Sequence, residues 1–175
     1  MIRVRDAVPE DVPQLLAIYN EAVRSSTATF DLEEQTLEER LEWFSTFGEK
    51  YPLIVAETEQ EIIGYCSLSP FNKKPAYKHT VELSIYLSPS HRGEGVGSLL
   101  MQKIIERAQQ LGVHSIISLI TAGNTPSIKL HQKFGFQFAG KLREVGYKFG
   151  EWLDVEYYQL LVNERILTMS AANGK

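Results

Sequence analysis

The sequence Arg92-Gly93-Glu94-Gly95-Val96-Gly97 joins two segments of different pattern. The segment before it, Val81 to Leu87, is apolar and typical of a strand, and Val96 to Leu111 after it has apolar residues at helical spacing. A strand, a glycine-rich turn and a helix start bind anions, because free backbone N–H groups and the helix dipole both favour negative charge there. The glycines permit the positive φ angles of such a turn, and Arg92 adds a permanent cation. We therefore predict a site for a pyrophosphate-bearing cofactor.

The spacing of these glycines differs from that of two common nucleotide motifs. Gly93, Gly95 and Gly97 give G-x-G-x-G, whereas a Rossmann fingerprint has G-x-G-x-x-G. No Gly-Lys-Ser/Thr follows, so the turn is not a P-loop either. Taken alone, such a turn is also compatible with a simple helix cap.

Length and charge limit the classes of function. The 175 residues suffice for one well-buried core and are few for two. The 18 basic and 22 acidic side chains give a net charge of −4, which argues against broad nucleic-acid binding. No apolar run reaches the length of a membrane span, and the N-terminus carries charges where a signal peptide has an apolar core. We expect a cytoplasmic protein that binds neither nucleic acid nor membrane.

Cys66 is the only cysteine, which excludes an internal disulfide and a cysteine metal cluster. It lies within an apolar strand pattern, where a buried apolar role is more common than a nucleophilic one. The histidines and carboxylates have no spacing that fits a metal site, so no metal is expected.

Apolar periodicity predicts strands and helices along the whole chain, which favours one α/β domain over residues 1–165 and a frayed tail at 166–175. The predicted strands are 2–5, 53–57, 62–68, 81–87, 115–120, 137–145 and 152–162, and the predicted helices are 12–23, 36–48, 96–111 and 124–134.

The second of these helices has a clear start signal. Thr36 and Glu39 have the spacing of a capping box. Leu37, Leu41 and Phe44 are expected to form its apolar stripe.

A second motif supports the first. The segment Asn124 to Phe136, Asn-Thr-Pro-Ser-Ile-Lys-Leu-His-Gln-Lys-Phe-Gly-Phe, resembles the last helix motif of the GNAT superfamily of N-acetyltransferases. The spacing Arg92-x-x-Gly95-x-Gly97 is similar to the acetyl-CoA pyrophosphate loop of the same superfamily. A glycine turn alone does not account for both matches.

Three stretches are similar to one subgroup, the phosphinothricin and methionine sulfoximine N-acetyltransferases. They are Ala76 to Glu82, Leu130-His131 and Gly146 to Val155, and the likeness covers roughly residues 2 to 163. The resemblance implies a single-domain GNAT fold, α/β in class, with a central, mixed and strongly twisted sheet of about seven strands flanked by helices. It also implies that the parallel strands at 81–87 and 115–120 splay apart to form the CoA cleft, with a bulge in the first.

The implied reaction is the transfer of an acetyl group from acetyl-CoA to the α-amino group of a small amino acid. An ammonium ion has no lone pair, so the acceptor must lose a proton and a general base assists. Glu82 interrupts the apolar pattern of its strand, which indicates a partly buried carboxylate with raised proton affinity. The resemblance assigns this residue as the base; the alternative is a solvated strand glutamate.

His131 is the second catalytic candidate. It stands where many superfamily members have a tyrosine that is proposed to protonate the departing thiolate, and histidine there matches the subgroup. Because imidazole titrates near neutral pH, we assign it a shared acid/base role. The alternative is a histidine that only fills a core or surface position.

The resemblance also implies the cofactor contacts. The strand at 81–87 would pair with the pantetheine arm mainly through backbone groups, and one of its N–H groups would serve as an oxyanion hole. Lys133 would meet a CoA phosphate or remain solvated. The predicted acetyl-CoA contacts are Ile85, Tyr86, Leu87, Arg92, Gly93, Glu94, Gly95, Val96, Gly97, Ser98, Asn124, Ser127 and Lys133.

An amino-acid acceptor carries a carboxylate, so its site needs cations or N–H donors. Lys73 and Lys74 precede Glu82 and are predicted to supply the charge, although lysine cannot clamp an oxyanion bidentately. Phe30 and Tyr77 match positions that line the acceptor pocket, with core packing as the alternative.

Two other functions remain open on the sequence. The same fold can acetylate a protein or peptide N-terminus, or it can bind an acyl-CoA without catalysis. Family analogy also predicts a homodimer, for which the aromatic-rich segment 137–162 would supply the surface.

Overall fold

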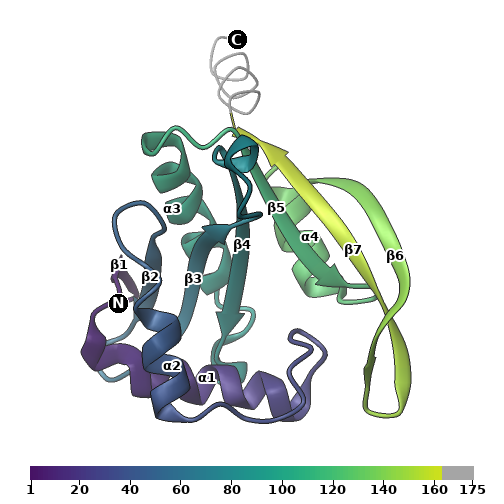
Figure 1. Ribbon diagram of the computed structural model, residues 1–175. Coiled ribbons are helices and arrows are strands. Elements are labelled where there is room, and N and C mark those ends of the chain that lie inside the picture. The colour runs from purple at the N-terminus through teal and green to yellow at the C-terminus, as the bar shows by residue number, and fades with distance from the viewer. Residues whose placement is uncertain (163–175) are drawn as a thin grey trace.

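The computed structural model describes residues 1–162 and contains one seven-stranded sheet in the order β1-β2-β3-β4-β5-β7-β6 (Figure 1). The predicted domain end at residue 165 and the predicted tail at 166–175 lie outside the described residues. The strands are β1 (Arg3–Asp6), β2 (Leu53–Glu57), β3 (Ile62–Pro70), β4 (Thr80–Leu87), β5 (Ser115–Thr121), β6 (Gln137–Lys148) and β7 (Glu151–Leu161). The helices are α1 (Val12–Ser25), α2 (Leu37–Phe44), α3 (Val96–Gln110) and α4 (Thr125–Lys133), with short 3₁₀ turns η1 (Pro9–Asp11), η2 (Pro75–Tyr77) and η3 (Pro89–His91).

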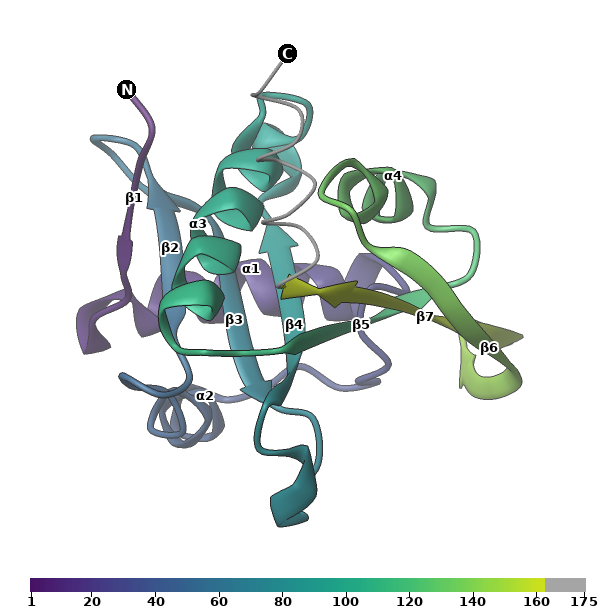
Figure 2. The ribbon, with the colours of Figure 1, turned by 90° about the horizontal axis from the view of Figure 1, so that it is seen from above.

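The helices cover both faces of the sheet. Apolar residues of α1 pack with β2 and β3 on one face, where α2 also lies. The buried side of α3 packs on the other face, and residues of α4 join that cluster. Figure 2 shows α2 and α4 on opposite sides of the sheet. This arrangement confirms the expected single-domain α/β architecture.

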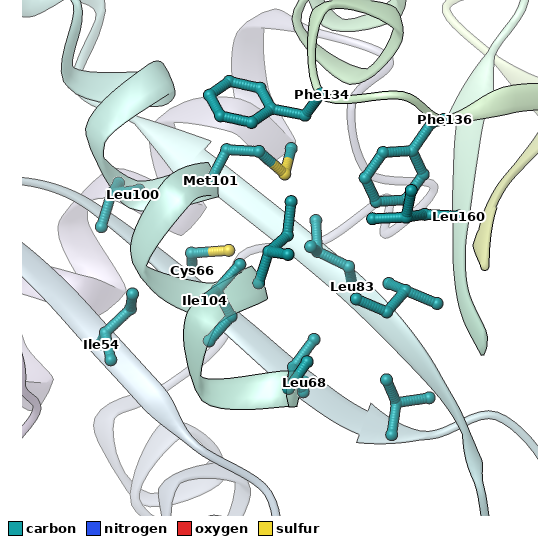
Figure 3. Packing of buried hydrophobic residues seen from close by; sticks show 14 of the residues in the cluster. Ile54, Cys66, Leu68, Leu83, Leu100, Met101, Ile104, Phe134, Phe136 and Leu160 are labelled. Carbon is teal, nitrogen blue, oxygen red and sulfur yellow. The ribbon is translucent and has the colours of Figure 1, made fainter. Parts of the chain in front are cut away.

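The larger core lies between α3 and the sheet. Met101 and Ile104 of α3 lie over Cys66 of β3 and Leu83 of β4, with Phe134 closing one end (Figure 3). Cys66 is fully buried, and burial raises the pKa of its thiol well above the ordinary value. The cysteine is therefore part of the core, as expected.

One strand pair determines where a cleft can form. β4 and β5 are the parallel neighbours in the described sheet, and their pairing consists of Thr80↔Ser115, Val81↔Ile116 and Glu82↔Ile117. Beyond Glu82 both strands continue, but they are no longer paired, and Figure 1 shows β5 leaving β4 at an angle. The predicted splay is thus present.

The bulge that was expected in β4 is absent along its pairing with β3. The register runs without a shift from Gly64↔Leu87 to Pro70↔Val81. β5, in contrast, stays paired with β7 over its whole length, so the two strands separate without a register shift in either of these pairings.

The second helix differs from the prediction on its buried side. The capping box is present, since Thr36 Oγ1 accepts from the N–H of Glu39 and the Glu39 carboxylate accepts from the N–H of Thr36. The helix ends at residue 44, however, and Leu37 and Leu41 are exposed. Arg40 is the residue that α2 buries.

Candidate functional site

A cleft with a volume of about 1400 Å³ opens where β4 and β5 separate. It exceeds the ~300–1,000 Å³ of common small-molecule sites, and so has room for a long ligand beside a small one. The elements around it are β4 from Glu82 onward, the turn before α3, β5, α4, the start of β7, and the segment from Ser25 to Phe30.

The glycine-rich turn forms one end of the cleft. Arg92, Gly93, Gly95, Gly97 and Ser98 line it. Gly93 and Gly95 have φ angles of 81° and 84°, which side-chain-bearing residues rarely adopt, and Gly95 is the N-cap of α3. The first N–H groups of α3 are therefore available to an anion, as the sequence predicts.

Two predicted residues of this turn face away from the cleft. Glu94 pairs with His91 at 3.0 Å, and this contact raises the pKa of the His91 imidazole. Val96, the first residue of α3, is buried in the core between that helix and the sheet. Both residues can therefore bind an anion only through their backbone N–H groups.

The start of α4 forms the opposite wall. The side chain of Asn124 caps the helix by accepting from the N–H of Ser127 at 3.4 Å, and both residues line the cleft. Lys133 lies at the other end of α4, where its Nζ donates to Ser98 Oγ at 3.0 Å. Lys133 does not line the cleft, but its ammonium group is next to Ser98, which does.

Glu82 lies at the last position of β4 that pairs with β5, and it lines the cleft. Its carboxylate is half-buried, and no hydrogen bond or ion pair with another described residue engages it. Burial raises the pKa of the Glu82 carboxyl above its ordinary value. The expected combination of a buried position and raised proton affinity is present.

His131 of α4 also lines the cleft and is only 1% exposed. Its Nδ1 lies 2.7 Å from the carbonyl oxygen of Ser127, and because a carbonyl only accepts, Nδ1 carries the proton. Nε2 then presents a lone pair and has no partner among the described residues. Burial, the dominant influence, lowers the pKa of the imidazole and keeps it neutral near pH 7.

The predicted acceptor residues separate into two groups. Phe30 lines the cleft, and its ring fills the space that a side chain would need at Gly146, where a Cβ would come within 2.3 Å of the ring. Lys73, Lys74 and Tyr77 lie in the exposed segment before β4 and do not line the cleft. The predicted role of these three residues at the acceptor site therefore receives no support from the structure.

Sequence reasoning missed how the loop carrying Phe30 is held. Tyr19 Oη lies 2.9 Å from Thr29 Oγ1, and the buried Lys148 donates to the carbonyl of Thr29 at 2.9 Å. Thr121 Oγ1 donates to the carbonyl of Thr27 at 2.5 Å. α1, β5 and β6 thus fix this wall through contacts that are distant in sequence. The one local signal for it was a lysine, Lys148, between the predicted strands 137–145 and 152–162.

The described residues contain no group of three or more histidines, cysteines and carboxylates that could hold a metal ion. Among the same residues, no helix is both long enough and apolar enough to cross a membrane.

Comparisons with known proteins place these features in one family. The acetyltransferase (GNAT) family model matches residues 15–136. An L-methionine sulfoximine/L-methionine sulfone acetyltransferase from Pseudomonas aeruginosa is 40% identical over 159 residues, which cover 90% of this chain and 92% of the relative.

Two solved structures extend the comparison. A phosphinothricin acetyltransferase from Sinorhizobium meliloti, in complex with acetyl-CoA, has a TM-score of 0.87 at 36% identity and covers 91% of this chain and 88% of its own. A ribosomal-protein-alanine N-acetyltransferase from Brucella melitensis has a TM-score of 0.88 at 40% identity, with coverages of 91% and 99%. With the parted strands and the glycine-rich turn at the start of α3, these likenesses establish that the chain belongs to the acetyltransferase (GNAT) family.

Proposed function

We propose that this enzyme transfers the acetyl group of acetyl-CoA to the α-amino group of a small amino acid or analogue, of the phosphinothricin, methionine sulfoximine or methionine sulfone type. One observation carries the proposal: Glu82 and His131, two groups suited to accept a proton, line the same cleft as the anion-binding turn. The relatives named for these acceptors span nearly the whole chain.

The residues present fit acetyl-CoA. The turn at Gly93 and Gly95 and the first N–H groups of α3 suit a diphosphate, with Arg92 beside them. On the cleft side of β4, beyond Glu82, backbone groups no longer pair with β5 and are free to bind an amide-containing arm. When bound, acetyl-CoA supplies an acyl group activated as a thioester.

Glu82 acts as the general base. A carboxylate with a raised pKa accepts a proton from an ammonium group more readily than a solvated one, directly or through a water molecule. The carboxylate must be ionised to act, so acid suppresses the reaction. A backbone N–H of β4 beyond Glu82 donates to the carbonyl oxygen of the thioester, on which negative charge develops as the amine attacks.

His131 takes part in the proton transfer. Its Nε2 is an acceptor in the neutral ring, and Nδ1–H fixes that tautomer through Ser127. The imidazole can therefore take the proton of the attacking amine and deliver it toward the departing sulfur.

A thiol-release assay tests the proposal. Wild-type protein is expected to release CoA with methionine sulfone, methionine sulfoximine and phosphinothricin, and Glu82→Gln to lower kcat by about 10²–10⁴-fold while acetyl-CoA still binds. Glu38→Gln, which alters an exposed carboxylate of α2, is the matched control and should leave kcat unchanged. Turnover by Glu82→Gln at the wild-type rate would remove the base from the mechanism.

A protein or peptide N-terminus is the second candidate acceptor, and the likeness to the Brucella melitensis protein favours it. The same assay with peptides that begin with alanine separates the two. Turnover with peptides and none with free amino acids or analogues would replace the first proposal by this one.

We further propose a homodimer and a cytoplasmic location. The β6–β7 hairpin exposes large apolar side chains that would be covered by a second copy: Phe138, Leu142, Val145, Tyr147, Phe149 and Trp152. Light scattering at micromolar concentration should give twice the mass of the chain, and Trp152→Glu should give the monomer. Cell fractionation checks the location.

A further inference from the structure

A second, smaller cavity of about 280 Å³ lies beside the cleft, under α1 and α2. Ser84 and Tyr86 of β4 line both the cleft and this cavity. The two spaces therefore share one wall, formed by the strand that carries Glu82.

Arg40 lines the small cavity and is 2% exposed. Its guanidinium lies 4.4 Å from the ring centre of Tyr19 and 3.4 Å from that of Trp43. Nη2 donates to Tyr65 Oη at 2.6 Å and Nη1 donates to Gln35 Oε1 at 3.3 Å. Nε has no partner, and none of the ion pairs among the described residues includes Arg40.

A buried guanidinium without a carboxylate is unusual, because burying an unpaired charge is costly. Aromatic faces offset part of that cost but do not neutralise the charge. The cavity also presents the hydroxyls of Ser67, Ser69 and Ser84, which have no hydrogen-bond partner among the described residues. A fixed cation and free hydroxyls around a small space are a donor set for an oxyanion.

The strand register connects this donor set to the proposed base. Ser69 is the cross-strand neighbour of Glu82, and Ser67 is that of Ser84. Side chains two residues apart on a strand point to the same face about 7 Å apart, so Glu82 and Ser84 follow one another along the wall. An amino acid with a side chain of glutamate length spans that separation.

We propose that Arg40, with the serine hydroxyls of β3 and β4, forms a subsite for an oxygen-bearing group, and that the tail of the acceptor occupies it while the α-amino group lies at Glu82. This inference rests on the proposed function. The subsite selects acceptors whose side chain ends in a sulfone, sulfoximine, phosphinate or carboxylate over acceptors that end in an apolar group.

The decisive measurement is a ratio of specificities. Methionine sulfone and methionine have the same length and differ in the sulfone oxygens. Arg40→Met should lower kcat/KM for the sulfone at least tenfold, through KM, and change the value for methionine by less than twofold. Arg40→Lys, which keeps the charge, should recover part of the loss. Ser84→Ala, which retains Arg40, should also lower the ratio of kcat/KM for methionine sulfone to kcat/KM for methionine.

Arg107→Met is the matched control, because it removes a partly exposed arginine of α3 on the opposite face of the sheet. It should leave the ratio unchanged. Calorimetric titration with acetyl-CoA checks that each variant keeps the cofactor site. An equal loss for both acceptors in Arg40→Met and no effect in Ser84→Ala would make Arg40 a packing residue and overturn the inference.

A second arm distinguishes a free anion from the acceptor tail. Titration with methanesulfonate should inhibit turnover of the sulfone competitively, and its binding should be lost in Arg40→Met. Binding of methanesulfonate without competition would assign the subsite to free anions and overturn the acceptor role. If the wild type turns over no amino acid, the proposed function fails by itself, and failure of methanesulfonate to bind would separately reject the subsite.

Discussion

At the residue scale, the side chains with the most informative chemistry are those that keep a polar atom without a protein partner. The Glu82 carboxylate, His131 Nε2 and Arg40 Nε are half-buried or buried and unpaired among the described residues. The sequence indicates the first two, because a glutamate interrupts a strand pattern and a histidine occupies a family position. It also carried a signal for Arg40, which is three residues after Leu37 and four before Phe44, on an apparently apolar stripe.

The Glu82 carboxyl predicts opposite effects on activity and stability. Because burial raises its pKa in the folded state, this group favours folding at low pH, and that contribution is lost as the pH rises through the folded pKa. Glu82→Gln should therefore raise the Tm at pH 7, while kcat falls as described above. Thermal unfolding at pH 4 and at pH 7 should show the gain only at the higher pH; an equal gain at both would point to an effect other than charge.

The same carboxyl predicts the pH profile. Activity should fall as the pH decreases through the raised pKa of Glu82, since only the carboxylate accepts a proton. Burial lowers the pKa of His131, so its ring is neutral at pH 7, and its protonation in acid removes a second proton acceptor. A plot of kcat/KM against pH should lose the acidic limb that belongs to Glu82 in Glu82→Gln, and an unaltered profile would assign the acidic limb to another group.

Gly95 is required by conformation rather than by space. An added Cβ would meet nothing within 4 Å, but the φ angle of 84° is strained for any other residue. Gly95→Ala should cost about 1–2 kcal/mol of unfolding free energy and weaken acetyl-CoA binding, because the turn would relax. Gly48→Ala, at a position that is also open but has no positive φ, is the control for urea denaturation and calorimetry. Equal behaviour of the two variants would exclude a role for the left-handed conformation.

At the scale of elements, local patterns predict helices and strands better than they predict which face is buried. The capping box at Thr36 is present, yet Leu37 and Leu41 are exposed and Arg40 is buried. The buried face of α2 is decided by Tyr19 and Tyr65, whose rings attract the guanidinium and are distant in sequence. Similarly, Lys73 and Lys74 are near Glu82 in sequence, but they lie in the exposed segment before η2 and do not line the cleft.

The capping box is expected to stabilise α2, the helix that carries Arg40. Thr36→Ala removes the acceptor for the N–H of Glu39 and should cost about 1 kcal/mol in unfolding free energy. Glu42→Ala, on the exposed side of the same helix, should change it by less than about 0.5 kcal/mol. Urea unfolding measures both, and equal small changes would show that the box contributes little to folding.

At the scale of the whole molecule, the chain consists of two groups of strands that meet at one short parallel contact. β1 to β4 form the first group and β5 to β7 the second, joined in the sheet by the three pairs between Thr80 and Glu82 and their partners in β5. The alternation of apolar segments predicts a sheet of this class, and the resemblance predicts the splay. The walls of the cleft depend on Thr27, Thr29 and Lys148, whose long-range hydrogen bonds leave no periodic signal in a sequence.

This arrangement predicts that acetyl-CoA stabilises the protein by joining the two groups across the cleft. The turn before α3 and the start of α4 lie on opposite walls, so a ligand that contacts both adds links that the sheet lacks. At one hundred times its Kd, a ligand adds about 2.7 kcal/mol to the unfolding free energy. For a chain of this length that corresponds to a rise in Tm of roughly 5–11 °C.

The residues that acetyl-CoA protects from hydrogen exchange show whether it joins the two strand groups or binds one wall only. Amide hydrogen exchange should slow in β4 beyond Glu82 and in β5 when acetyl-CoA is present, because backbone groups there acquire partners. Pantetheine, which lacks the diphosphate, should protect β4 but raise the Tm less, and Gly95→Ala should reduce the rise with acetyl-CoA toward that of pantetheine. If protection were confined to the turn and the first residues of α3, the ligand would bind one wall only, and the parted strands would not be its site.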